Sequence, residues 1–160
     1  MKGKLFLSGI LGVTLVFGLV LAGCGGEDDS NGNGGSNLNG IWNTDQAFGD
    51  VSFNNGNFER YADGSAYRRG TYTTNGSILT LVYTHVYGGY YGKPSLGWGN
   101  LESKWYSRSD IEALDTTVLP DKTEALSRWF VTASYGYSVD NSLLTFSEGG
   151  QVRYTFTRKN

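Results

Sequence analysis

Two-residue turn motifs recur at short intervals between Leu38 and Asn160, and they constrain the fold more than any other feature. Each motif contains two residues drawn from Gly, Asn and Asp, and the motifs lie at 55–56, 63–64, 75–76, 88–89, 140–141 and 149–150. Such pairs suit the positive φ angles that tight β-hairpins require. The spacing therefore predicts short antiparallel strands that are joined in sequence order.

The segments between these turns alternate apolar and polar residues, as half-buried antiparallel strands do. The pattern predicts eight strands, at 40–46, 49–54, 57–62, 66–74, 77–87, 128–138, 142–148 and 151–158. In three of these strands the alternation places a set of residues on one face. In 77–87 the set is Leu79, Leu81, Tyr83, His85 and Tyr87; in 128–138 it is Trp129, Val131, Ala133, Tyr135 and Tyr137; and in 151–158 it is Val152, Tyr154 and Phe156.

Eight strands in sequence order most simply close into an up-and-down antiparallel barrel, because closure removes exposed strand edges. A two-sheet sandwich or a half-open barrel would satisfy the same pattern. The region 88–127 interrupts the pattern and is expected to be an insertion between the fifth and sixth strands. Ser109 with Glu112, and Asp121 with Glu124, have the spacing of helix capping boxes. The insertion is therefore expected to contain two short helices, at 109–115 and 121–127.

The N-terminus has the pattern of a secretory signal peptide. Lys2 and Lys4 precede an uncharged, largely apolar run over 5–22. A retained transmembrane anchor is the alternative, but the run contains several small or polar residues and is marginal for a bilayer, which needs roughly 20 mostly apolar residues.

Cys24 is the only cysteine in the chain, and it follows Leu21, Ala22 and Gly23. This stretch resembles the lipobox of bacterial lipoproteins, which implies cleavage after Gly23 and acylation of Cys24. Two or three acyl chains hold a protein stably on a membrane, whereas a single chain binds only marginally. An exported protein with a free thiol is the alternative.

On this interpretation the chain has three parts. Residues 1–23 are a signal peptide that is removed, and 24–37 are the lipidated cysteine and a flexible tether of Gly, Asn, Ser and acidic residues. Residues 38–160 form the barrel domain with its insertion. We expect a bacterial envelope location with the membrane as a partner through Cys24. In lipoproteins of enteric bacteria, the lack of Asp after this cysteine favours the outer membrane.

Gly40, Ile41 and Trp42 at the start of the first strand resemble the Gly-x-Trp motif of lipocalins, and the Gly-Thr-Tyr hairpin at 70–81 is similar to one in bacterial lipocalin-like lipoproteins. The resemblance implies that Trp42 packs across the closed end of the barrel. It also implies that an arginine from near the C-terminus lies against this indole, with Arg158 favoured over Arg153.

The chain offers little for catalysis. Its only histidine is His85, and Cys24 is its only thiol. A zinc site needs three or four nitrogen, sulfur or carboxylate ligands in a defined arrangement, and no such motif is present. We therefore expect no metal, no cofactor and no enzyme activity, with a hydrolase as the alternative. The net charge of −2 lacks the basic excess of nucleic-acid-binding domains, so no nucleic acid is expected.

Tyr and Trp are concentrated between 83 and 106. Either they fill one mouth of the barrel, or some stay accessible and bind a partner with their large, partly polar rings. The candidate ligand-binding residues are Tyr83, His85, Tyr87, Tyr91, Trp98, Trp105 and Trp129. The favoured function is a lipid-anchored protein whose barrel binds a small hydrophobic or amphipathic ligand. The alternative is an interaction protein that binds another protein or a glycan through the aromatic loop 87–106, with no internal ligand.

Overall fold

The computed structural model of the chain describes residues 38–93 and 96–159. The predicted signal peptide, lipobox and tether lie outside these residues and stay predictions. No helix within the described residues has the length and apolar character needed to cross a membrane.

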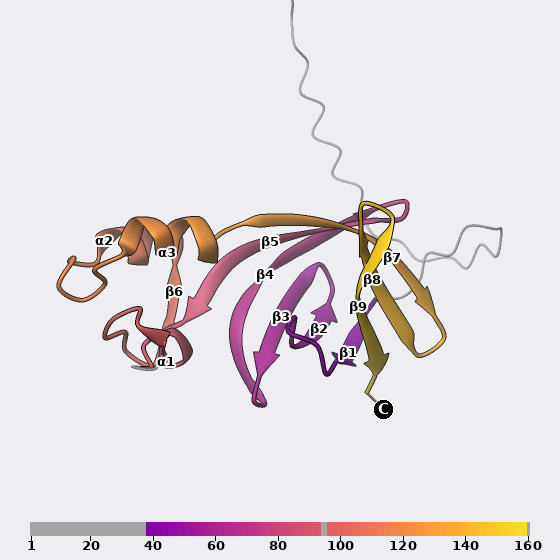
Figure 1. Cartoon of the computed structure of the whole chain (residues 1–160), viewed down its shortest axis with the longest axis horizontal. Helices are drawn as coiled ribbons and strands as arrows, with labels where there is room; N and C mark the ends of the chain where they lie inside the picture. Colours follow the sequence, from indigo (N-terminus) through magenta and orange to yellow (C-terminus); the bar gives the residue numbers. More distant parts are fainter. Residues whose placement is uncertain (1–37, 94–95, 160) are drawn as a thin grey trace, which may run out of the picture. The chain divides into compact units, whose positions relative to one another are not determined.

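Within the described residues, nine antiparallel strands form one sheet, of which eight close into a barrel (Figure 1). The barrel strands are β1 (Gly40–Asn43), β2 (Asp50–Asn54), β3 (Asn57–Ala62), β4 (Ser65–Asn75), β5 (Ile78–Tyr87), β7 (Thr132–Asp140), β8 (Leu143–Glu148) and β9 (Gln151–Arg158). Sequential strands pair with one another, β9 pairs with β1, and β4 pairs with β5. The predicted eight-stranded up-and-down antiparallel barrel is confirmed, and the sandwich and half-open barrel are excluded.

The insertion between β5 and β7 contains α1 (Gly88–Tyr91), the short strand β6 (Trp105–Ser107), α2 (Arg108–Ala113) and α3 (Lys122–Trp129). β6 pairs with the last residues of β5, whereas the first half of β5 pairs with β7. Figure 1 shows this group of elements beside the end of β5, away from β8 and β9. The two predicted helices are present with shifted bounds. The Gly pair at 88–89 begins α1 rather than forming a hairpin, and β6 was not predicted.

Capping explains the shift of the first helix. The side chain of Ser107 accepts a hydrogen bond from the backbone N–H of Asp110, and the Asp110 carboxylate accepts one from the Ser107 backbone N–H. The predicted box of Ser109 and Glu112 is therefore wrong by two residues, because Ser107, at the end of β6, already satisfies the free N–H groups of the first turn. In α3, Asp121 is the N-cap residue but its side chain makes no capping hydrogen bond.

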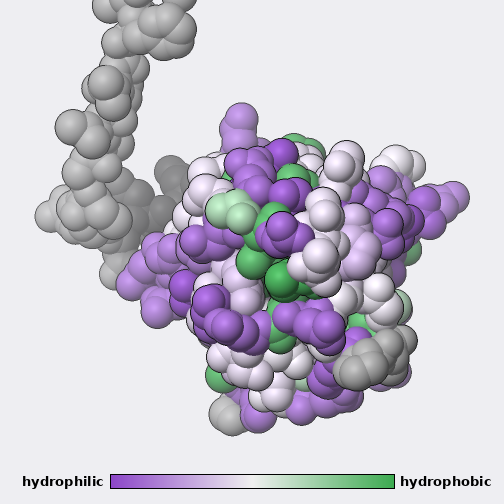
Figure 2. All heavy atoms as spheres, turned by 90° about the vertical axis from the view of Figure 1, so that its left-hand side faces the viewer, coloured by the Kyte–Doolittle hydropathy of each residue, from purple (hydrophilic) through white to green (hydrophobic). Residues whose placement is uncertain are grey.

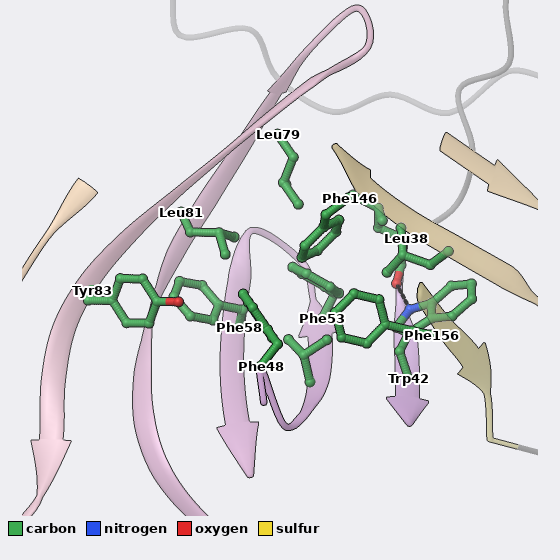
Figure 3. Close-up of a cluster of buried hydrophobic side chains, with 12 residues drawn as sticks. Leu38, Trp42, Phe48, Phe53, Phe58, Leu79, Leu81, Tyr83, Phe146 and Phe156 are labelled. Atoms are coloured by element: carbon green, nitrogen blue, oxygen red, sulfur yellow. Dashed lines mark hydrogen bonds between the residues drawn. The ribbon is translucent and has the colours of Figure 1, made fainter. Parts of the chain in front are cut away.

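Two separate hydrophobic clusters stabilise the domain. The barrel core contains Leu38, Trp42, Phe48, Val51, Phe53, Phe58, Leu79, Leu81, Tyr83, Leu144, Phe146 and Phe156 (Figure 3). The insertion core contains Tyr67, Val86, Tyr91, Leu101, Tyr106, Ile111, Leu119, Ala125 and Trp129. Both lie within 38–159, so this segment carries its own cores and we expect it to fold without the preceding residues. Seen from the insertion end, the surface is mainly hydrophilic, with a narrow band of apolar residues (Figure 2).

A β-bulge in β5 overturns part of the predicted strand face. Arg69 pairs with His85 and Gly70 pairs with Tyr83, so Thr84 has no partner of its own on β4. An extra residue in one strand reverses the alternation beyond it. Tyr83 therefore stays in the barrel core, but Val86 is the next fully buried residue. The prediction that His85 and Tyr87 continue the inward face is wrong.

Two further strand predictions are corrected. Where β8 pairs with β9, Phe146 is opposite Tyr154 and Ser147 is opposite Val152. Arg153 is therefore an extra residue in β9, and Val152 beyond it is 62% exposed. The predicted strand at 128–138 begins only at Thr132, because Trp129 belongs to α3 and is buried in the insertion core. The first strand ends at Asn43 rather than at residue 46.

The Trp42 contact that the lipocalin resemblance implies is present in the barrel. Trp42 and Arg158 are cross-strand partners, and the guanidinium carbon lies 4.4 Å from the centroid of the indole ring. The indole Nε1 donates a hydrogen bond of 2.8 Å to the carbonyl of Leu38 (Figure 3). Trp42 is completely buried, so it links the start of the domain to the closing strand β9.

Candidate functional site

The loop 44–49 closes one end of the barrel with an aromatic side chain. Connections of an antiparallel barrel alternate between its ends, so this loop lies at the same end as the turn 63–64 and the insertion, and we call this end the mouth. Phe48 is 3% exposed and lies within the barrel core (Figure 3). Its ring centroid lies 4.8 to 6.2 Å from those of Tyr135, Phe146, Tyr154 and Phe156. At the mouth, the interior is therefore filled from a loop rather than from the strands.

Two arginines lie close together in this region. Arg60 on β3 and Arg68 on β4 are direct cross-strand partners. The Arg60 guanidinium carbon lies 3.8 Å from the Phe48 ring centroid, and its two terminal nitrogens donate to the hydroxyl of Tyr83, at 3.1 Å, and to the carbonyl of Phe48. The two guanidinium carbons lie 5.9 and 5.2 Å from the same Tyr83 ring centroid. Both cations therefore lie near the Tyr83 ring, and Arg60 also contacts Phe48.

Tyrosines complete this arrangement. The Nε of Arg68 donates to the hydroxyl of Tyr91, and one terminal nitrogen donates to the carbonyl of Arg128 at 3.1 Å. The hydroxyl of Tyr67 donates to the Phe48 carbonyl at 3.3 Å. We call this group the mouth cluster; it consists of Phe48, Arg60, Tyr67, Arg68, Tyr83 and Tyr91.

The mouth cluster carries positive charge without an acidic partner. The described hydrogen bonds and ion pairs join neither guanidinium to a carboxylate. The Nε of Arg60 is shielded from solvent and has no hydrogen-bond partner within the described part of the chain. Like charges on directly opposed residues of neighbouring strands destabilise a sheet, so this arrangement costs free energy as it stands.

The surrounding phenols do not supply the missing negative charge. Burial raises the pKa of Tyr91 to about 12, although the charge of Arg68 opposes this. Burial also raises the pKa of Tyr67, against the opposing charges of Arg60 and Arg68. Burial by itself lowers the pKa of Arg60, but Tyr83 and the other tyrosines more than offset this and the pKa is raised. At neutral pH both phenols are therefore neutral and Arg60 is charged.

The predicted ligand-binding residues separate into three places. Tyr83 and Tyr91 belong to the mouth cluster. Trp98 and Trp129 pack together in the insertion, with ring centroids 5.2 Å apart, and Trp129 also packs on Tyr91 at 4.6 Å. Much of the predicted aromatic loop therefore forms the insertion core. The interpretation that the aromatic residues 83–106 fill one mouth of the barrel is therefore met only in part, because Tyr83 lies in the barrel core.

His85, Tyr87 and Trp105 lie on the opposite face of the sheet from the buried Val86. Tyr87 and Trp105 are cross-strand partners with ring centroids 5.4 Å apart, and the Arg69 guanidinium carbon lies 4.5 Å from the Trp105 ring centroid. Beside them lies a surface hollow of about 570 Å³, whose lining includes His85, Ser107, Ser109, Glu112 and Phe130.

This hollow does not contain an assembled catalytic pair. The Nδ1 of His85 lies 3.0 Å from the hydroxyl of Thr84, and burial and the charge of Arg69 lower the pKa of His85. Ser107 is its cross-strand partner, but the Ser107 hydroxyl hydrogen-bonds to Asp110 at 2.6 Å within the helix cap. An activated serine needs a hydrogen bond to its base. No described hydrogen bond joins His85 to Ser107, so this geometry gives hydrolysis no support.

The described residues also contain no group of three or more His, Cys, Asp or Glu side chains that is arranged to hold a metal ion. The arginines of the mouth cluster were missed by sequence reasoning. A signal existed, because Arg60 follows the core residue Phe58 at the spacing of one strand face and therefore occupies an inward position.

Comparison of the chain with known protein families, with curated proteins and with solved structures gives no match in any of the three. The geometry of the mouth cluster is therefore the best guide to function.

Proposed function

We propose that this protein is a bacterial envelope lipoprotein, anchored through acyl chains on Cys24, whose barrel binds a small amphipathic ligand at its mouth. The observation that supports binding is the position of Phe48. This ring is held by a loop, so it can leave the interior without breaking any pairing between strands. Its departure would expose an apolar space lined by Tyr135, Phe146 and Phe156, directly beside polar groups of the mouth cluster.

The alternative, a protein or glycan partner bound by the aromatic loop 87–106, has less surface available. Tyr91, Leu101 and Tyr106 of that loop are buried in the insertion core. Outside that core, Leu96 is 39% exposed, Trp98 is partly buried against Trp129, and Tyr87 packs on Trp105, on which Arg69 already stacks.

Binding is tested by isothermal titration of the segment 38–160 with decanol below its solubility limit. We expect saturable binding of one decanol per barrel. In Phe48→Leu the smaller side chain packs less well in the mouth, and a loss of about 1.4 kcal/mol in packing would tighten binding roughly tenfold. Val152→Ala, a change at an exposed position on β9, serves as the control and should bind like the parent. Absence of saturable binding to both the parent and Phe48→Leu would contradict the proposal.

Anchoring is tested separately with Cys24→Ala in the full chain, expressed in a bacterium. Since the lipid is a diacylglycerol group joined to the cysteine sulfur by a thioether, we expect the variant to accumulate as the longer precursor and to lack incorporated radiolabelled palmitate. The parent chain should be shortened, labelled and recovered with the membranes. A variant that is processed and labelled like the parent would refute the lipobox interpretation.

A further inference from the structure

We propose that Arg60 and Arg68 bind the carboxylate headgroup of the ligand, and that the protein is therefore selective for acidic amphipathic molecules. This inference rests on the proposed binding at the mouth and adds the chemical class of the ligand. Three observations support it: the unpaired charge of the two arginines, the unused Nε donor of Arg60, and the way Phe48 now contacts Arg60.

The positive charge of Arg60 and Arg68 is unbalanced. Four arginine or lysine side chains in the described residues, Lys104, Arg108, Arg128 and Arg153, each form an ion pair with a carboxylate, and all four are exposed. Arg60 and Arg68 are less exposed and directly opposed, yet the described ion pairs include neither of them. Exposed pairs contribute little to stability, whereas a covered charge without a partner is costly. An anion between the two guanidinium groups would remove that cost.

Arg60 has a donor geometry that suits a carboxylate. Its two terminal nitrogens are used by Tyr83 and Phe48, but its Nε is shielded and has no partner. A guanidinium presents its N–H groups as a planar fork that matches the two oxygens of a carboxylate. A carboxylate that replaced the Phe48 carbonyl would accept from the terminal nitrogen and from Nε together, and would satisfy the unused donor.

Phe48 has the same two features as an acidic amphipathic molecule. Its carbonyl oxygen accepts hydrogen bonds from Arg60 and from Tyr67, and its phenyl ring occupies the apolar interior. One residue of the loop thus places an oxygen acceptor on the arginine and an apolar group among the aromatic rings. A carboxylate with a hydrocarbon tail presents the same two features in the same order, with a full negative charge.

The test is isothermal titration of the segment 38–160 at neutral pH with three probes: decanoate, decanol and acetate, each below the concentration at which it aggregates. Decanoate and decanol share a tail and differ in headgroup, whereas acetate is the headgroup alone. The variants are Arg60→Gln and Arg68→Gln, which keep hydrogen-bonding capacity but remove charge. Arg153→Gln, at an exposed ion pair on β9, is the matched control. Circular dichroism checks that each variant is folded, and Arg68→Gln decides the test if Arg60→Gln does not fold.

We expect the parent to bind decanoate at least about tenfold more tightly than decanol, the effect of one charge-assisted hydrogen bond. Arg60→Gln and Arg68→Gln should weaken decanoate binding by about 10- to 100-fold, so that the preference for decanoate over decanol is lost. Arg153→Gln should alter neither. Acetate should bind far more weakly than decanoate, because it has no tail to place in the interior.

The possible failures are distinguishable. Equal affinity for decanol and decanoate, unchanged in Arg60→Gln, would overturn the selectivity for acids and leave the proposed binding function standing. Acetate binding as tight as that of decanoate would show a site for small free anions and would overturn the amphipathic class. Absence of binding by decanoate and decanol alike would remove both the proposed function and this inference.

Discussion

Substitution of Gly70 by alanine is expected to destabilise the barrel by about 3 kcal/mol or more, at the upper end of the cost of overpacking. A Cβ atom at this position would lie 1.9 Å from the carbonyl oxygen of Val82 and 2.9 Å from a ring carbon of Phe58. The obstacle is the backbone of β5, which cannot rotate away as a flexible side chain can. Gly70 lies in the pairing of β4 with β5 that closes the barrel. The loss should appear as a lower urea midpoint in unfolding followed by tryptophan fluorescence.

Gly76→Ala is the matched control for this prediction. Gly76 lies in the turn between the same two strands, with a φ of +57° and no atom within 4 Å of the added Cβ. Its substitution should cost about 1–2 kcal/mol, from the left-handed backbone alone. A Gly70→Ala domain as stable as Gly76→Ala would show that β4 and β5 do not approach as closely as described.

Trp42→Ala is expected to lower the free energy of unfolding by about 3–5 kcal/mol. The indole is completely buried, its Nε1 donates to the Leu38 carbonyl, and the Arg158 guanidinium lies over its ring. Removal of the ring leaves a cavity, an unsatisfied carbonyl and a cation without its aromatic partner. Urea unfolding measures the loss, and near-ultraviolet circular dichroism reports whether the remaining aromatic rings stay fixed.

Two variants separate the contributions at this position. Trp42→Phe keeps an aromatic ring and removes the hydrogen bond to Leu38, so it should cost less than Trp42→Ala. Trp98→Ala removes an indole that is only partly buried in the insertion and should also cost less. Equal losses for Trp98→Ala and Trp42→Ala would contradict the central place assigned to Trp42 in the barrel core.

The strand prediction failed where a bulge reversed the alternation. Up to Tyr83 the inward residues of β5 are those expected from the sequence, but the extra residue Thr84 exchanges the faces and turns His85 away from the barrel. The same occurs near Val152 in β9. A bulge forms where the two partner strands differ in residue count between fixed contacts, and neither strand alone contains that information.

The insertion shows a related limit. Its helices were predicted from capping spacing, but Ser107 and Ser109 both offer a hydroxyl at the start of α2. Ser107 is the N-cap because β6 pairs with β5 up to that residue, and the chain can turn into a helix only where the pairing ends. The pairing of β6 with β5 therefore determines which of the two serines caps α2.

Local chemistry was sufficient for the barrel itself. Turn pairs set the hairpins, alternation set the strands, and closure followed because an open sheet would expose two edges. Which residues come together in the mouth cluster, by contrast, is determined only by the tertiary structure. Strand register makes Arg60 and Arg68 cross-strand partners, and Phe48 reaches Arg60 from a loop that the sequence pattern does not place. Periodicity identifies which face a residue occupies, whereas contacts between distant residues depend on pairing register and loop path, which arise when the whole chain packs.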